Sequence, residues 1–308
     1  MKLSMIYIVI IAFIIISCGN ISKNIDLSQK VDSGEIFQQN DIDYTQYYTE
    51  IYRADSLFIT KNYKNSYKIL DSLLQIYKPV NGWTVNVPRE YLLSKSAVSK
   101  VKRKDVEDYL NEKAFDVDAI FQDKSIVKLL EEFKIGKNEL EKIVLKNVSE
   151  INIPLRIELE KMSLRDQKVR NTKNYDSIKK IDSLHSNRLK EIIETVGFPN
   201  EKVVGGYRLQ GKSSQIFLTT LFNHMAYNGD YNYFKKILPK LIKNGTCDPF
   251  NYAMLEDREN EITNRPIEYY VIITLPESVD RKKINANRKL IGLPSLEYEE
   301  FKKKVMSN

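Results

Sequence analysis

The chain has 308 residues, of which 48 are Lys or Arg and 41 are Asp or Glu. Residues 151–308 hold 27 of the basic and 20 of the acidic side chains, so the net charge of +7 is confined to the C-terminal half. This excess suits either an anionic partner or an ordinary solvated surface, but the basic clusters at 281–283 and 302–304 lack the interleaved aromatic residues of a nucleic-acid surface, and we expect no nucleic-acid partner.

Residues 1–17 have the pattern of an export signal, with Lys2 followed by nearly uninterrupted apolar residues from 5 to 16. The apolar run is too short to span a bilayer. Ile15-Ile16-Ser17-Cys18 resembles a bacterial lipobox, in which the signal is cleaved before the cysteine. The resemblance implies a diacylglyceryl thioether and an N-acyl chain, such as palmitate, on Cys18. Membrane lipid is then a partner of the chain.

Gly19 after the cysteine resembles an outer-membrane rather than an inner-membrane sorting signal. We therefore expect a lipid-anchored protein of the bacterial cell envelope. Once Cys18 is lipidated, Cys247 is the only remaining thiol, so an intramolecular disulfide and a cysteine metal cluster are excluded.

Residues 18–44 are rich in Ser, Asn, Asp, Gln and Lys, which predicts a flexible tether. Residues 45–148 then show helical apolar periods. The spacing of Ala54, Leu57-Phe58, Tyr63 and Ser66, with Pro79 at the end, resembles one tetratricopeptide repeat. A weaker second unit follows, with Trp83 in the loop between the two units. Such helix pairs form either a protein-binding surface for another envelope protein or a spacer.

Residues 149–308 form a second predicted domain, which is also mostly helical. Polar and turn residues recur in it in the order and spacing of a bacterial family. They are Asp166-Gln167 with Arg170, Asp182 with His185 and Leu189, Gly197-Phe198-Pro199, Val204-Gly205, His224, Leu255-Glu256-Asp257-Arg258 and Gly292-Leu293-Pro294. This half of the chain thus resembles the domain of unknown function 6624 family, a resemblance that implies no established activity.

Some positions depart from the pattern of that family. Phe198 stands where a Trp is usual, and Asn223 where a Gln precedes the His. Residues 269–272 and Asn287-Arg288 also differ, so a role that depends on those segments does not carry over. The Asp, Arg and His positions are kept.

Helical periodicity places several of these charged residues on apolar stripes. Asp166 falls among Leu155, Leu159, Met162 and Val169 of one helix. The same arithmetic turns His185, His224 and Asp257 towards the core on three other helices. Each buried charge alone would cost several kcal/mol, so we expect one shared polar cluster.

Three interpretations of this cluster stay open. It can be a structural network in which Arg170 or Arg258 neutralises the aspartates. It can be a catalytic or ligand-binding site for acid–base or hydrolytic chemistry, with Gln167 and Asp182 as further members. Its two imidazoles and two carboxylates could also bind a divalent metal, although no close-spaced pair such as HExxH is present, and we expect neither a metal nor another cofactor.

The segment Gly206 to Ser213 matches the phosphate-loop pattern GxxxxGK[ST]. Only two apolar residues precede it as a strand, and no second apolar strand ending in Asp follows. We therefore expect no nucleotide partner. The clearest strand is instead Tyr269 to Thr274, which is β-branched and aromatic and is predicted to pair in a small hairpin.

The sequence as a whole predicts a mainly α fold, with tetratricopeptide-like helix pairs followed by a mostly helical domain that carries a small β-hairpin. It favours a membrane-anchored binding or interaction module. An envelope enzyme is the alternative, and the sequence leaves open whether the chain is an enzyme.

The lipid anchor has a direct test. Globomycin blocks cleavage of lipoprotein signals, so treated cells should accumulate a precursor larger than the mature chain by about the mass of residues 1–17. Cys18→Ala should move the protein out of the membrane fraction. A chain of unchanged size with and without the drug would contradict the anchor.

Overall fold

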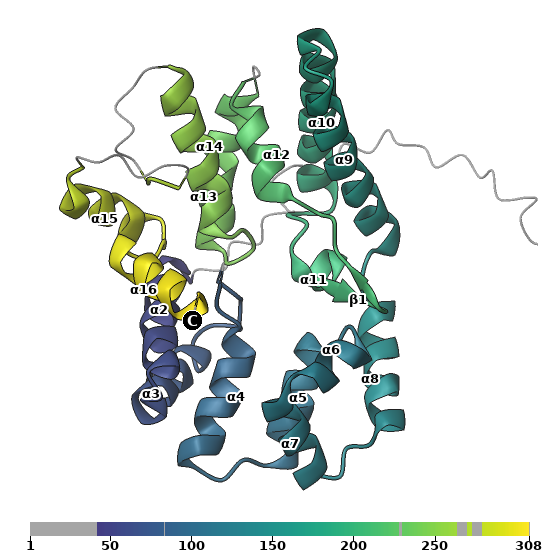
Figure 1. Ribbon diagram of the computed structural model, residues 1–308, viewed down its shortest axis with the longest axis vertical. Helices are drawn as coiled ribbons and strands as arrows, with labels where there is room; N and C mark the ends of the chain where they lie inside the picture. Colours follow the sequence, from purple (N-terminus) through teal and green to yellow (C-terminus); the bar gives the residue numbers. More distant parts are fainter. Residues whose placement is uncertain (1–41, 83, 228–229, 264–269, 273–278, 308) are drawn as a thin grey trace, which may run out of the picture. The chain divides into compact units, whose positions relative to one another are not determined.

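A computed structural model describes residues 42–82, 84–227, 230–263, 270–272 and 279–307. The predicted signal, Cys18, most of the predicted tether and Trp83 lie outside the described residues. The described part holds fifteen helices and one two-stranded antiparallel hairpin, so the predicted mainly α fold with a small hairpin is confirmed (Figure 1). Among the described helices, none has the length and apolar character to cross a bilayer.

The N-terminal helices follow the predicted apolar periods, and the first four described helices pack in chain order, each against its neighbour (Figure 1). Ser66 and Ser94, two of the small residues in the proposed helix pairs, are fully buried, and the Ser94 hydroxyl donates to Ser66 over 3.3 Å. The bounds are α2 Thr45–Ile59, α3 Tyr63–Leu74, α4 Val87–Val98, α5 Arg103–Lys113, α6 Val117–Gln122, α7 Lys124–Glu132 and α8 Lys137–Ser149.

The C-terminal helices begin at polar caps. Asn152, Asn174 and Asp248 each accept a backbone N–H in the first turn of the helix that follows. The bounds are α9 Ile153–Asn171, α10 Tyr175–Thr195, α11 Glu201–Val204, α12 Leu218–Met225, α13 Tyr231–Lys243, α14 Pro249–Ile262, α15 Arg281–Leu290 and α16 Leu296–Met306. Gly245 follows α13 with φ +75°, the left-handed conformation in which many helices end.

The hairpin lies at a different place from the predicted one. It pairs β1, Arg208–Leu209, with β2, Lys212–Ser213, inside the segment that matches the phosphate-loop pattern. Gln210 and Gly211 between them have φ of +47° and +80°, as the tight turn of a two-residue hairpin requires. Residues 270–272, the described part of the predicted strand, are not in a strand, and the remainder lies outside the described residues.

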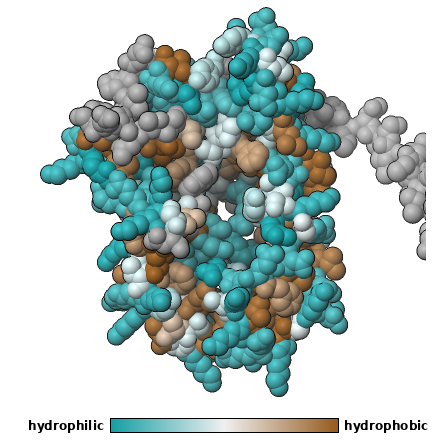
Figure 2. Space-filling model, viewed as in Figure 1, coloured by the Kyte–Doolittle hydropathy of each residue, from teal (hydrophilic) through white to brown (hydrophobic). Residues whose placement is uncertain are grey.

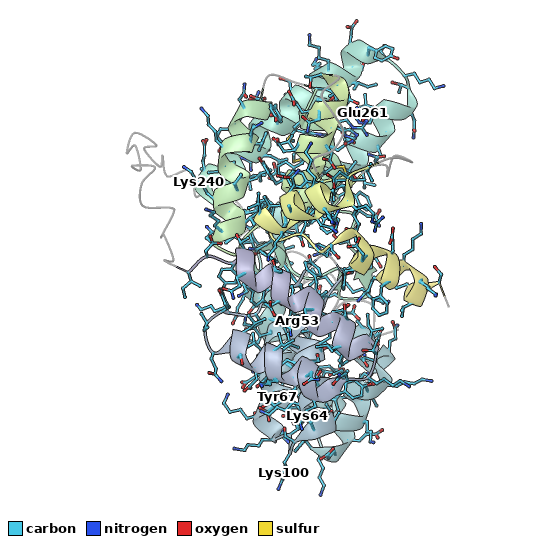
Figure 3. The ribbon with its side chains drawn as sticks, turned by 90° about the vertical axis from the view of Figure 1, so that its left-hand side faces the viewer. Arg53, Lys64, Tyr67, Lys100, Lys240 and Glu261 are labelled. Atoms are coloured by element: carbon cyan, nitrogen blue, oxygen red, sulfur yellow. The ribbon has the colours of Figure 1, made fainter. Side chains whose placement is uncertain are left out.

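Helix α2 is covered by both halves of the chain. Its Tyr47 and Tyr48 are fully buried, and the Tyr48 hydroxyl donates to the carbonyl of Cys247 over 3.2 Å. Helices α15 and α16 pack against it, and Figure 3 shows them beside the helix that carries Arg53. Residues 39–308 thus form one compact unit, and the domain boundary near residue 148 stays a prediction from the sequence pattern.

A buried ion pair joins the C-terminal helix to the first one. Asp55 on α2 is 1% exposed and accepts from Lys302 over 2.7 and 2.8 Å and from the Tyr298 hydroxyl over 2.7 Å. Burial, together with the nearby charge of Asp55, raises the pKa of Glu90 on α4 to about 9. Glu90 is therefore protonated at neutral pH, beside a carboxylate that is already neutralised by a lysine.

This cluster makes stability depend on pH between about 4.5 and about 9. The folded state keeps a proton on Glu90 that the unfolded chain releases from near its ordinary pKa of 4.5, so the free energy of unfolding should fall as pH rises towards about 9. Glu90→Gln stays neutral and should flatten that slope in urea titrations. Glu131→Gln, at an exposed position, is the control. Equal slopes for the wild type and Glu90→Gln would contradict the assignment.

Candidate functional site

Three packed helices, α9, α10 and α12, carry most of the predicted site residues. The start of α12 is fixed on α9, because the backbone N–H of Phe217 donates to the Ser163 hydroxyl over 3.0 Å. Ser163 lies one turn before Asp166 on the same helix. This contact places His224 of α12 opposite Asp166 of α9.

Asp166 is 1% exposed and its carboxylate is fully engaged. It accepts from Arg170 Nη2 over 3.1 Å and from Gln167 Nε2 over 2.8 Å, and His224 Nδ1 lies 3.0 Å from its Oδ1. Asp166 therefore has the partners that a carboxylate on an apolar stripe requires.

Arg170 connects the cluster. Its guanidinium donates to Asp166, to Asp182 of α10 and, from Nε over 2.9 Å, to His224 Nδ1. Nδ1 accepts from Arg170 only when it carries no proton, and donates to Asp166 only when it is protonated. The network thus has two hydrogen-bond arrangements, which differ in whether Nδ1 of His224 carries a hydrogen.

Burial and charge move the pKa values of the two aspartates in opposite directions. Burial raises the pKa of Asp166, but the hydrogen bonds and charges of His224 and Arg170 outweigh it and leave that pKa lowered. For Asp182, burial outweighs the attraction of Arg170 and His224, so its pKa is raised. Asp166 is the permanent anion of the cluster, and Asp182 is the more readily protonated member.

His185 lies one turn after Asp182 on α10 and is 5% exposed. Its Nδ1 is buried and has no hydrogen-bond partner among the described residues. Burial lowers the pKa of His185, against the attraction of Asp166. His185 is thus a neutral imidazole at the edge of the cluster, with a free ring nitrogen.

The structure does not bring Asp257 and Arg258 into this cluster, contrary to the expectation of one shared site. Arg258 does not pair with Asp257 either. Its Nε donates to Asn223 over 2.8 Å, its Nη1 pairs with Glu261, and its guanidinium lies 6.0 Å from the ring centre of Tyr227. The helical arithmetic correctly turned Asp257 inward, at 2% exposed, but it could not say which neighbours it would meet.

Asp257 instead holds a loop. Its two carboxylate oxygens accept from the backbone N–H of Tyr270, over 3.0 Å, and of Ile272, over 2.7 Å. Between these two amides Val271 has φ +57°, a costly conformation for a β-branched residue. Burial raises the pKa of Asp257 to about 6 in spite of the two backbone donors. Asp257 is a structural clamp in this fold.

A cleft in the centre of the described part is a second candidate, which the sequence analysis missed. It has a volume of about 550 Å³ and is walled by loops of both halves. Figure 2 shows the surface hollowed in the middle of the view. Phe198-Pro199 and Val204-Gly205, two landmarks of the family resemblance, line it, and they were the signal that could have located it.

The cleft wall mixes cations, amides and carboxyl groups. Lys113 pairs with Glu201 over 2.5 Å, and Asn81 donates to the same carboxylate over 3.1 Å. Asp248, the cap of α14, also lines the cleft, and burial raises its pKa to about 7. A carboxyl group that titrates near neutral pH in a cleft is a common feature of functional sites.

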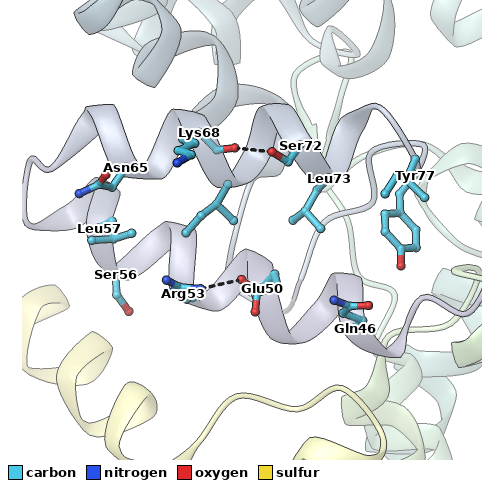
Figure 4. A pocket seen from close by; sticks show the side chains of 12 residues that line it. Gln46, Glu50, Arg53, Ser56, Leu57, Asn65, Lys68, Ser72, Leu73 and Tyr77 are labelled. Carbon is cyan, nitrogen blue, oxygen red and sulfur yellow. Dashed lines mark hydrogen bonds and ion pairs between the residues drawn. The ribbon is translucent and has the colours of Figure 1, made fainter.

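A groove of about 810 Å³ runs between α2 and α3 on the repeat-like half (Figure 4). Arg53 and Glu50 pair across one turn of α2 at its rim, over 3.3 Å, and both belong to an open surface. The charged pair at the rim is too exposed to make the groove a catalytic site.

No family model matches the chain, and no curated protein or solved structure matches it. The resemblances to the unknown-function family and to tetratricopeptide repeats stay predictions.

Because Asp257 and Asp182 lie in separate clusters, the effects of their substitutions on the free energy of unfolding should be additive. Asp257→Asn and Asp182→Asn share no partner, so their costs in unfolding free energy should add within about 0.5 kcal/mol. Arg170→Gln and Asp182→Asn remove the two ends of one ion pair and should couple by about 1 kcal/mol or more. Urea denaturation of the single and double variants measures both. Strong coupling between Asp257 and Asp182 would restore the single shared cluster.

Proposed function

We propose that the chain is a lipid-anchored protein of the bacterial envelope that binds a small polar ligand in the central cleft. The anchor rests on Cys18 and its lipobox. The ligand site rests on one observation, the cleft of about 550 Å³ between the two halves, which lies within the range of about 300–1,000 Å³ usual for small-molecule sites.

The cleft is a better candidate for a site of a small polar ligand than the Asp166 cluster is. Arg170 directs its donors to Asp166, Asp182 and His224, so these polar groups have hydrogen-bond partners within the protein. The two aspartates are at most 5% exposed. The hydrogen bonds of the cluster link α9, α10 and α12.

The lining of the cleft defines the ligand class. Lys78 and Lys202 are exposed cations at the cleft, and Tyr207, 70% exposed, offers an aromatic face with a hydroxyl tip. Asn200 and Asn244 add amide groups. This combination suits a molecule with hydroxyl or amide groups and one acidic group, such as an envelope saccharide or a short peptide.

One observation favours the enzyme alternative at the same place. The pKa of Asp248 is raised to about 7, which suits a general acid or base. Asp248→Asn keeps an oxygen to cap α14 and removes the titrating proton. If the cleft is catalytic, that variant should bind the ligand and lose turnover.

Binding in the cleft is tested with matched tyrosine variants. Purified full-length protein is screened by thermal shift against peptidoglycan fragments, envelope saccharides and short peptides. Tyr207→Ala should weaken any hit by about tenfold, because it removes a large contact surface at the ligand. Tyr175→Ala, on α10 and 84% exposed, is the control and should bind as the wild type does. A ligand that binds Tyr207→Ala and Lys202→Glu as tightly as it binds the wild type would contradict binding in the cleft.

A further inference from the structure

We propose that Asp166, Asp182 and His224 form a binding site for one divalent transition-metal ion, with Zn²⁺ as the ion to test first. Each residue offers a ligand atom, and these three atoms all lie within 4.8 Å of one another. They come from α9, α10 and α12, so the site is held by three packed helices.

The donor set and its spacing fit such an ion. Two carboxylates and an imidazole are oxygen and nitrogen ligands that first-row divalent metals accept. Ligands about 2.1 Å from zinc in tetrahedral geometry lie about 3.4 Å apart. His224 Nδ1 and Asp166 Oδ1 are already 3.0 Å apart, and the ligand atom of Asp182 lies within 4.8 Å of the other two.

The charge of the cluster also favours a cation. Two buried carboxylates face one guanidinium, so the acidic groups outnumber the arginine that they share. Arg170 now contacts all three proposed ligands. Its side chain is 23% exposed and it lies in the last turn of α9, so it can turn to solvent when a metal replaces it.

His185 is the independent observation that points to a ligand. It is 95% buried, its Nδ1 has no partner among the described residues, and it lies on the same face of α10 as Asp182. The nearby charges of Asp166 and Arg170 act on the pKa of its ring in opposite directions. Its ring nitrogens lie outside the group of ligand atoms within 4.8 Å of one another, so His185 is a neighbour of the site and not one of its ligands. Gln167, which donates to Asp166 over 2.8 Å, would orient the first carboxylate.

The experiment uses Arg170 as a switch. Full-length protein in detergent is stripped of metal, and Zn²⁺ binding is measured by equilibrium dialysis and by thermal shift. We expect about one ion per wild-type chain. Arg170→Gln removes the competing cation and should bind Zn²⁺ about tenfold more tightly or better. It should also regain, with Zn²⁺, the thermal stability that it loses without metal.

Ligand variants and a matched control complete the design. Asp182→Asn and His224→Ala should weaken Zn²⁺ binding by about tenfold or more, and Asp176→Asn, exposed on the same helix, should not. Visible absorption of Co²⁺ bound to the wild type reports tetrahedral nitrogen and oxygen ligation even if a variant fails to fold.

Two results would overturn the proposal. One is an Arg170→Gln protein that is folded and binds no stoichiometric Zn²⁺ or Co²⁺. The other is an ion that Asp182→Asn and His224→Ala bind as tightly as the wild type. The metal site and the cleft share no residue, so either can fail without the other.

Discussion

The close packing of two glycines on the tyrosines of α2 is the constraint on which the rest of the structure depends. Gly245 and Gly292 both have positive φ, and a Cβ atom on either would lie 2.7 to 2.8 Å from Tyr44 or Tyr48. Only glycine fits both conditions. These contacts bring the turn after α13 and the turn after α15 onto the first helix. Since Tyr44 and Gly245 both line the central cleft, the cleft exists because this packing holds the two halves together.

Buried charge is the second organising feature, and each buried carboxylate is stabilised by a different kind of partner. Asp55 is neutralised by Lys302, Asp166 shares Arg170 with Asp182, and Asp257 accepts two backbone amides. Breaking such a pair costs about 3–5 kcal/mol, because it leaves a buried charge without a partner. The three clusters therefore fix which helices contact one another, which a purely apolar interface would specify less strictly.

Periodicity in the sequence was enough to predict the helices and the direction of individual side chains. Asp166, His185 and Asp257 are buried as their apolar stripes indicate. It could not predict partners, because a stripe gives the face of a helix and not the helix that covers it. The sequence offered Arg170 or Arg258 as the partner of the aspartates without choosing between them. In the structure Arg170 contacts Asp166 and Asp182, whereas Arg258 pairs with Glu261. The strand prediction failed near Val271 because β propensity does not account for a carboxylate that binds the amides on both sides of a residue.

The phosphate-loop match shows how geometry decides what a motif means. In a true phosphate loop the glycines let backbone amides surround a phosphate at a helix N-terminus. Here Gly211 supplies the left-handed residue of a hairpin turn, and its amide donates to the Asp116 carboxylate. An amide that already binds a carboxylate of its own chain is engaged with an anion. The hydrogen bond from Gly211 to Asp116 thus attaches the hairpin to the start of α6. The hairpin follows Gly205 and Gly206, which line the cleft.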